Sequence, residues 1–350
     1  MAKKPKAKPK EKDKPGAKEE GGCDTTTLYK NYLLVCQSIG VDPYDDLKDI
    51  VTKTGEQIII TPGSSGQLSS GSCRALLSAL DGKLEGSDVN IEPFTALTDL
   101  RIRSSNIGDT GAYAVAAFIR ATNQEQGGVE KKLQYLDLSD NNIGYWGALN
   151  LGRSFEVGMN KSITNLILDF NSLGPRGVSA LCKGLGTNSS LRVLSLKHCR
   201  IDPMGGEPIA SMLTFSRLAL TTLDLSSNNI GGIGLNVLCR GLVKNTSLTT
   251  FRLADNNVRQ TDEDLKALEA FGQVLSVETK LSEIDLNHNL IDNKGGSLLL
   301  PGVRDNKQIT TFKVSEIGMD KEIYEALFRV GNTPKKAKKG NKKKSKKTSR

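Results

Sequence analysis

Leu133-Gln-Tyr-Leu136-Asp-Leu138-Ser-Asp-Asn141-Asn-Ile143-Gly144 decides the fold, because the same spacing returns at Leu220-Thr-Thr-Leu223-Asp-Leu225-Ser-Ser-Asn228-Asn-Ile230-Gly231. Further segments keep the apolar positions of this register, and they begin at Leu97, Ile163, Leu191, Leu248, Leu281 and Ile309. The starts at 163, 191, 220 and 248 are 28, 29 and 28 residues apart. An internal repeat of this period predicts a solenoid, in which each unit packs only against its neighbours.

Each unit has the pattern of a short strand followed by a helix. Apolar residues at the fourth and sixth positions alternate with polar ones, as in a strand with one buried face. The ninth position is Asn in five units, while Ser105 and Cys199 replace it in two others. There, an Asn amide can satisfy backbone groups where the chain leaves the strand. Stretches such as 177–185 and 234–242 then have the apolar spacing of an amphipathic helix.

This pattern is the leucine-rich repeat, and its length resembles the ribonuclease-inhibitor class of such repeats over residues 97–330. The resemblance implies an α/β solenoid, or horseshoe, with parallel β-strands on the concave face and α-helices on the convex face. It also implies a binding protein rather than an enzyme. Longer steps between some repeats predict an insertion at 124–132 and a longer helix after Gln260.

The sequence predicts four parts: a disordered basic tail (1–23), a helical N-terminal cap (24–54), the repeat domain (55–330) and a disordered lysine-rich tail (331–350). Ile58-Ile59-Ile60 is expected to form a degenerate first strand, followed by a helix at 72–80. At the other end, 309–314 and 320–330 are expected to form a last degenerate repeat.

The predicted cap has two interpretations. Thr25–Thr27 can begin a helix that Gly40 ends, and a second short helix is expected at 44–51. Such helices cover the apolar edge of a first repeat. The string Tyr29-x-x-Tyr32-Leu-x-x-Cys36-x-x-x-Gly40-Val-x-Pro43 also looks like the helical preface of intracellular leucine-rich-repeat proteins of cilia and flagella. Those include repeat subunits associated with the dynein regulatory complex and radial spokes.

Charge is distributed unevenly along the 350 residues. Residues 1–22 hold eight Lys and four acids, and residues 335–350 hold nine Lys, one Arg and no acid. Since the whole chain carries +9, tails of +4 and +10 leave −5 for the remainder. The lysines of the second tail are Lys335, Lys336, Lys338, Lys339, Lys342, Lys343, Lys344, Lys346 and Lys347.

This lysine run leaves three alternatives open: attachment to an acidic polymer such as tubulin tails, a nuclear or nucleolar address with RNA contact, or a solvated tail. No aromatic residue is interleaved with the lysines, so stacking on nucleic-acid bases is not expected. Binding would be directed at carboxylates or phosphates and would depend steeply on salt.

Motifs for catalysis, cofactors and metals are absent. The six cysteines show no C-x-x-C spacing and are interpreted as reduced structural thiols of the cell interior. The sequence contains no phosphate-binding loop, nucleophile elbow, secretory signal or membrane-spanning run. We therefore expect no catalytic, cofactor-binding or metal-binding residues.

The candidate partner-binding residues are the variable strand positions, which we expect on the concave face. Tyr135 and Phe170 are the best aromatic anchors, since buried aromatics often dominate interface energy. A simpler alternative is that these positions are polar only because they face water. The set comprises Arg101, Arg103, Tyr135, Asp137, Asp169, Phe170, Lys197, His198, Asp224, Arg252, Asp255, Asp285 and His288.

Together these features predict a non-enzymatic scaffold for protein partners, a monomer in isolation, in a cytoplasmic cytoskeletal assembly such as the microtubule-based axoneme. No membrane contact is expected. The first alternative is a soluble nuclear or nucleolar adaptor addressed by the lysine tail. The second is a small-GTPase regulator, since the GTPase-activating protein for Ran has similar repeats. That protein has an acidic C-terminal region, whereas this chain ends in lysines.

Overall fold

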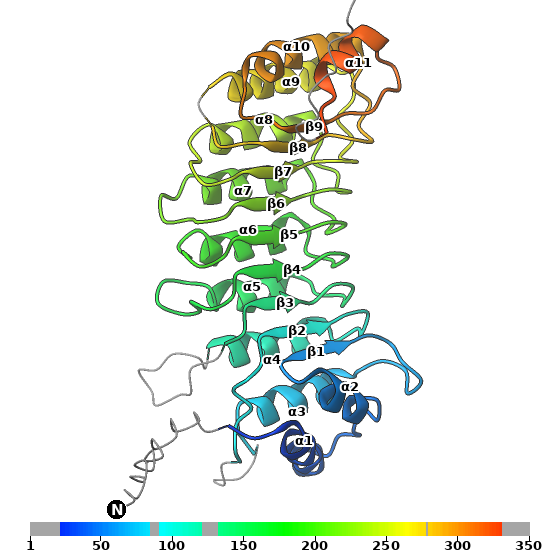
Figure 1. Cartoon of the computed structure of the whole chain (residues 1–350), viewed down its shortest axis with the longest axis vertical. Coiled ribbons are helices and arrows are strands. Elements are labelled where there is room, and N and C mark those ends of the chain that lie inside the picture. Colours follow the sequence, from blue (N-terminus) through cyan, green and yellow to red (C-terminus); the bar gives the residue numbers. More distant parts are fainter. Residues whose placement is uncertain (1–21, 85–90, 121–131, 278, 331–350) are drawn as a thin grey trace, which may run out of the picture.

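The computed structural model describes residues 22–84, 91–120, 132–277 and 279–330. Within these ranges, nine parallel strands form one sheet in sequence order (Figure 1). Each strand has only three or four residues. They are β1 (Gln57–Ile60), β2 (Asp99–Ile102), β3 (Tyr135–Asp137), β4 (Asn165–Ile167), β5 (Val193–Ser195), β6 (Thr222–Asp224), β7 (Thr250–Arg252), β8 (Glu283–Asp285) and β9 (Thr311–Lys313).

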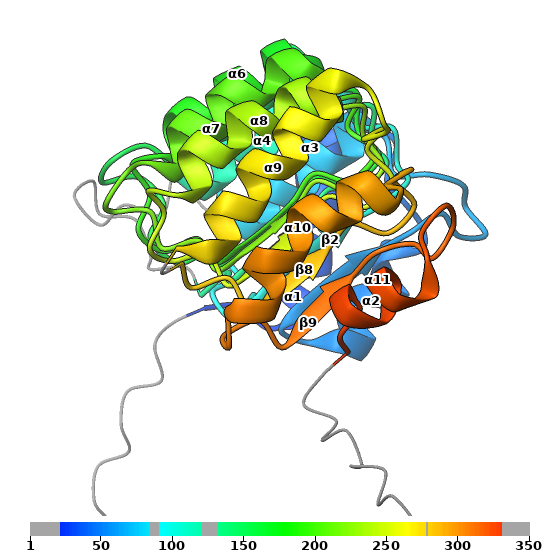
Figure 2. The same ribbon diagram turned by 90° about the horizontal axis from the view of Figure 1, so that it is seen from above.

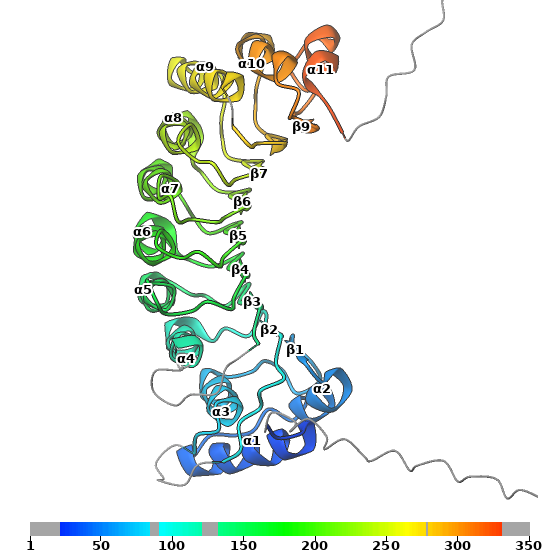
Figure 3. The same ribbon diagram turned by 60° about the vertical axis from the view of Figure 1, so that its left-hand side comes forward.

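Helices form a second layer on one side of this sheet (Figure 2). The strands line the inner side of an arc and α3–α10 lie on its outer side (Figure 3), so the predicted leucine-rich-repeat horseshoe is confirmed. The helices are α1 (Thr25–Ile39), α2 (Leu47–Thr54), α3 (Ser70–Leu80), α4 (Gly108–Arg120), α5 (Tyr145–Arg153), α6 (Gly174–Leu185), the 3₁₀ helix η2 (Pro203–Gly205), α7 (Gly206–Leu213), α8 (Gly231–Leu242), α9 (Asp262–Ser276), α10 (Asn293–Asp305) and α11 (Lys321–Leu327).

The core lies between the two layers and repeats the apolar register of the sequence. Leu136, Leu166 and Leu194 pair across neighbouring strands, and all three are fully buried. Each contributes about 2 kcal/mol of hydrophobic stabilisation. On the outer side, Gly152 and Gly184 let α5 and α6 approach closely, because a Cβ on Gly184 would meet the backbone of Gly152.

The ninth-position amides connect successive repeats, as the sequence predicts. Asn171 Oδ1 accepts hydrogen bonds from the amides of Asn141 (3.2 Å) and Ile143 (2.9 Å). Its Nδ2 donates to the carbonyls of Leu138 and Leu168, both at 2.9 Å. These bonds satisfy buried backbone groups that the short strands leave unpaired. Cys199 keeps part of this role, since its thiol donates to the carbonyl of Leu168 at 3.1 Å.

Two short helices precede the first complete repeat. Helix α1 lies across the end of the arc, beside α3 (Figure 3). Its N-cap is Asp24, which accepts from the Thr27 amide at 2.7 Å, so the predicted Thr cap is wrong by one residue. A carboxylate is equally suited to this position. Gly40 ends the helix with φ +66°, as predicted. Helix α2 begins at Leu47, later than expected.

Two other predicted irregularities, the longer helix after Gln260 and the degenerate last repeat, are found as well. Helix α9 has 15 residues and begins with a capping box between Thr261 and Asp264. At the C-terminal end, β9 and α11 form the last repeat. The backbone of Phe312 also forms an isolated antiparallel β-bridge with the backbone of Arg329. The predicted insertion at 124–132 falls almost wholly outside the described residues, as do both predicted tails. Within the described ranges, no helix is long and apolar enough to cross a membrane.

Candidate partner-binding surface

The charged side chains on the concave face form ion pairs with one another. In each of five pairs the acid is the more buried member: its side chain is 2% to 18% exposed, while the base is 28% to 40% exposed. The pairs are Arg101–Asp99, Arg103–Asp137, Lys197–Asp169, Arg252–Asp224 and Lys313–Asp285. The concave acids therefore do not form an exposed acidic surface.

At β2 and β3 short hydrogen bonds also join the two members of each ion pair. Arg101 donates to Asp99 from Nε (2.9 Å) and from a terminal nitrogen (2.6 Å), which raises the pKa of the guanidinium. Arg103 Nε donates to Asp137 at 2.7 Å. The second oxygen of Asp137 accepts from Ser139 Oγ at 2.6 Å. Both oxygens of the buried Asp137 carboxylate are thus engaged, one by an ion pair and one by a neutral hydroxyl.

Tyr135 belongs to the same cluster. The Arg101 guanidinium carbon lies 4.4 Å from its ring centroid, a cation–π geometry. Burial first, and then the nearby Asp137 charge, raise the pKa of its phenol. One face of the ring is thus already occupied within the protein, so Tyr135 offers a partner less surface than the sequence suggests.

At β5 to β8 the ion pairs are longer. Lys197 Nζ lies 3.4 Å from Asp169 and 3.9 Å from Asp224. Arg252 lies 3.8 Å from both Asp224 and Glu283. The acids are instead fixed by neutral donors: Ser195 Oγ donates to Asp169 at 2.6 Å, and the Ser226 amide to Asp224 at 3.0 Å. The two cations are therefore held less tightly than their counterparts at β2 and β3.

These cations border a hollow of about 460 Å³ at the middle of the concave face. Ile167 and Val193 provide apolar lining, and Phe170 lies at the rim. Of the predicted set, the hollow brings together Arg103, Tyr135, Asp137, Asp169, Phe170, Lys197, Asp224 and Arg252. Arg101, His198, Asp255, Asp285 and His288 do not line it.

The eighth repeat position lies outside the strands, which corrects the expectation that Phe170, His198, Asp255 and His288 stand on the concave sheet. All four have φ between 50° and 60°, so the chain turns there in the left-handed conformation. Because each strand ends three residues earlier, these side chains lie at the edge of the sheet. Phe170 is 54% exposed and stacks on His198 with the ring centroids 4.5 Å apart.

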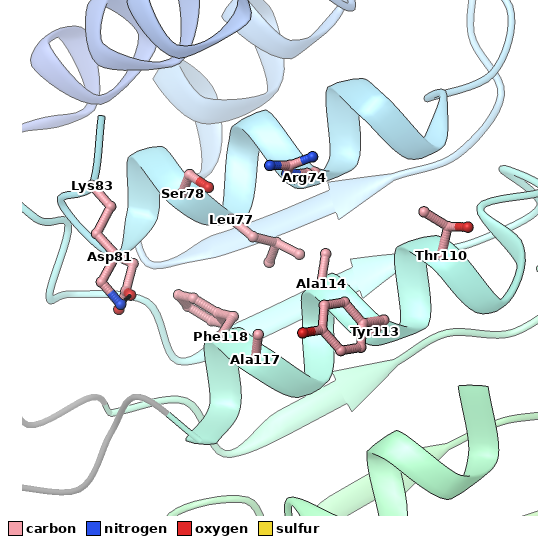
Figure 4. A pocket seen from close by; sticks show the side chains of 10 residues that line it. All are labelled: Arg74, Leu77, Ser78, Asp81, Lys83, Thr110, Tyr113, Ala114, Ala117 and Phe118. Carbon is pink, nitrogen blue, oxygen red and sulfur yellow. Dashed lines mark ion pairs between the residues drawn. The ribbon is translucent and has the colours of Figure 1, made fainter. Parts of the chain in front are cut away.

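A second hollow, of about 420 Å³, lies on the outer surface between α3 and α4 (Figure 4). Leu77, Ala114 and Phe118 form an apolar lining, and Tyr113 stands at its rim, 55% exposed. Lys83 and Asp81 form an ion pair at one end. The chain passes from both helices into segments outside the described residues (85–90 and 121–131).

Within the described ranges, nothing gathers three or more potential metal ligands. All six cysteines lie in these ranges, buried and without disulfides. Burial raises the pKa of the Cys73, Cys182, Cys199 and Cys239 thiols to about 12. Such thiols are poor nucleophiles at neutral pH and serve as small core side chains.

Comparisons with known proteins agree with this architecture. A leucine-rich-repeat description matches residues 95–116, 130–152, 160–182, 187–210 and 220–239. The chain is 30% identical to pig (Sus scrofa) ribonuclease inhibitor over 220 residues, which are 62% of this chain and 44% of the inhibitor. It is 35% identical to human (Homo sapiens) NACHT, LRR and PYD domains-containing protein 12 over 146 residues, 41% of this chain and 13% of that protein.

The protein is a leucine-rich-repeat solenoid, and its repeats are similar to those of ribonuclease inhibitor. It spans less than half the length of these curated relatives. Among solved structures, a Leiomodin-1 Actin-Binding Site 2 chain aligns at TM-score 0.36 and 19% identity, covering 47% of this chain and 92% of that one. A similarity this low supports no inference. Leucine-rich-repeat proteins of this type are typically binding scaffolds rather than enzymes.

Several residues of the solenoid surface were missed in the sequence. Asp99, Ile167, Val193, Glu283 and Lys313 occupy the third or fifth repeat position, which faces the concave side. The signal was available, since every repeat shares one register. Ile167 and Val193 differ from the rest in being apolar at positions that face the concave side.

Proposed function

We propose that this solenoid is a non-enzymatic scaffold whose concave hollow and Phe170 edge bind a protein partner within a cytoskeletal assembly, the axoneme of cilia or flagella. The exposure and backbone conformation of Phe170 are the observation that supports this surface as the binding site. A bulky side chain in the left-handed conformation costs about 1–2 kcal/mol. The same edge has Asp140 and Asp255 at equivalent positions, which tolerate that conformation better. A large exposed aromatic at φ +58° is therefore best explained by what it contacts.

The axonemal setting is supported by the string from Tyr29 to Pro43 and by the lysine tail, both read from the sequence. Structural roles also account for part of that string. Tyr32 is buried, and its hydroxyl accepts from the Tyr44 amide at 2.7 Å, while Gly40 ends α1. The string alone would therefore suit any solenoid that needs its first repeat covered.

Localisation of the tagged full chain in a flagellated cell tests the setting. The proposal predicts retention along the axoneme after detergent and after high salt, because a solenoid interface does not depend on lysine tails alone. Release by detergent, or a nuclear signal, would contradict the proposed axonemal localisation. A nuclear signal would favour the adaptor alternative.

A photo-crosslinking side chain tests the surface separately. Placed at Thr222, a half-buried residue of β6 that lines the hollow, it should capture a discrete protein, whereas the same group at the exposed Lys183 of α6 should not. Equal capture at both positions would contradict a concave partner site.

A further inference from the structure

The concave face presents cations even though its charges nearly cancel. Among the ion-paired side chains on the concave face of the described residues, there are six acids and five bases. Five of the acids form the floor, and only Glu283, at 49% exposure, is as accessible as the bases. A partner that reaches this face therefore meets ammonium and guanidinium groups first.

Three of these cations, Lys197, Arg252 and Lys313, retain donor capacity within the described residues, and the first two line the hollow. Lys197 Nζ and the Arg252 guanidinium form no hydrogen bond there, and their nearest carboxylate contacts are ion pairs of 3.4 Å and 3.8 Å. By contrast, Arg101 and Arg103 donate at 2.6–2.9 Å. An incoming carboxylate could accept charge-assisted hydrogen bonds at Lys197 and Arg252 without first breaking short ones.

The spacing of the two cations suits an extended chain. Lys197 lies two residues beyond the end of β5 and Arg252 lies on β7, two strands along the sheet, so their backbones are about 12 Å apart on the diagonal. Residues i and i+4 of an extended chain point to the same face and span about 13 Å, so they match this separation. The apolar lining from Ile167 and Val193 lies in the same hollow, with Phe170 at its rim.

We infer that the centre of the concave face recognises an acidic, extended segment of a protein, with two carboxylates about four residues apart on one face of the segment and a neighbouring apolar side chain. The carboxylates bind Lys197 and Arg252, and the apolar side chain enters the hollow beside Phe170. This inference rests on the proposed scaffold function and adds the chemistry of its partner.

A protein segment fits better than a nucleic acid. The near-neutral sum of the concave charges provides little long-range attraction for a polyphosphate, which relies on many unopposed cations. The buried acids beneath each cation would also repel a continuous row of phosphates. A segment with only two carboxylates and an apolar residue meets the cations locally and fills the hollow.

Selection from a phage-displayed random peptide library on the immobilised full chain tests the inference. We expect enrichment of paired Asp or Glu about four positions apart, with an aromatic or aliphatic residue nearby. In fluorescence anisotropy, replacing both acids of a selected peptide by Gln should weaken binding at least about tenfold, equivalent to about 1.4 kcal/mol. The variant K197Q/R252Q should lose binding to the same extent.

The matched control is R240Q/R304Q, which removes two cations from ion pairs on the outer helices. It should bind the selected peptide as the original chain does, and melting curves should show that both double variants are folded. Selection of basic or neutral peptides, an unchanged affinity of K197Q/R252Q, or no enrichment at all would overturn the inference. Displacement of the peptide by an equimolar oligothymidylate would also overturn it. The crosslink from Thr222 would still report on the scaffold function in each of these cases.

Discussion

Two parts of the concave face use the same residue types to different ends. At β2 and β3, Arg101 and Arg103 are bound to carboxylates by hydrogen bonds of 2.6–2.9 Å, and Arg101 also covers Tyr135. At β5 to β7, Lys197 and Arg252 stand 3.4–3.9 Å from carboxylates that neutral donors already hold. The first part, the closed cluster, stabilises the fold. The second, the open cluster, keeps donors available for a ligand.

The difference has a geometric origin. Asp99 and Arg101 are two residues apart on one strand, so their side chains share a face and the planar guanidinium meets the carboxylate edge-on. Lys197 and Arg252 instead share Asp224 between them, and each also lies near a second acid. A cation attracted to two acids settles between them and forms short bonds with neither.

The largest expected difference concerns the acids. Asp137→Ala removes the partner of Arg103 and the acceptor of the Ser139 amide and hydroxyl, so we expect the free energy of unfolding to fall by about 3 kcal/mol. Asp224→Ala loses one amide hydrogen bond and two long ion pairs, and should cost about 1 kcal/mol. Urea unfolding followed by circular dichroism measures both, and equal losses would contradict the distinction between the clusters.

A smaller difference is expected when the cations are neutralised in pairs. In R101Q/R103Q the free energy of unfolding should fall by about 1.5 kcal/mol. The loss is smaller than for fully buried pairs, because both arginine side chains are partly exposed to solvent. K197Q/R252Q should change stability by less than about 0.5 kcal/mol, since long ion pairs of half-exposed groups contribute little. A stability loss in K197Q/R252Q as large as that in R101Q/R103Q would show that the open cluster is structural too.

The smallest effect is expected at the edge of the open cluster. Phe170→Asn replaces an aromatic at φ +58° by a residue that adopts the left-handed conformation readily, while it loses the stack on His198. We expect the free energy of unfolding, measured by thermal denaturation, to rise by about 0.5 kcal/mol, because the relieved backbone strain slightly exceeds the lost stacking energy. Asp255→Asn, at the equivalent position, should change nothing measurable. A destabilised Phe170→Asn variant would mean that the ring supports the fold rather than a partner.

Much of this molecule follows from short-range pattern in the chain. The spacing of Leu133, Leu136, Leu138 and Asn141 predicts a short strand, a turn held by an amide and a helix. Local physical chemistry enforces all three, so the horseshoe and the Asn hydrogen bonds were predictable. The end helices were predicted too, although Asp24 rather than a threonine caps α1, because several oxygen-bearing residues can fill one N-cap.

What the sequence by itself determined is the repeat and hence which positions face inward. Only the tertiary structure decided which charges meet: Arg103 contacts Asp137 from the neighbouring strand, whereas Lys197 stands between Asp169 and Asp224. Only the structure shows that Phe170 and His198 lie beyond the ends of their strands, at the edge of the sheet, where they stack. The physical reason is that periodicity depends on neighbours along the chain. Distances between charged groups depend instead on how adjacent repeats pack against each other.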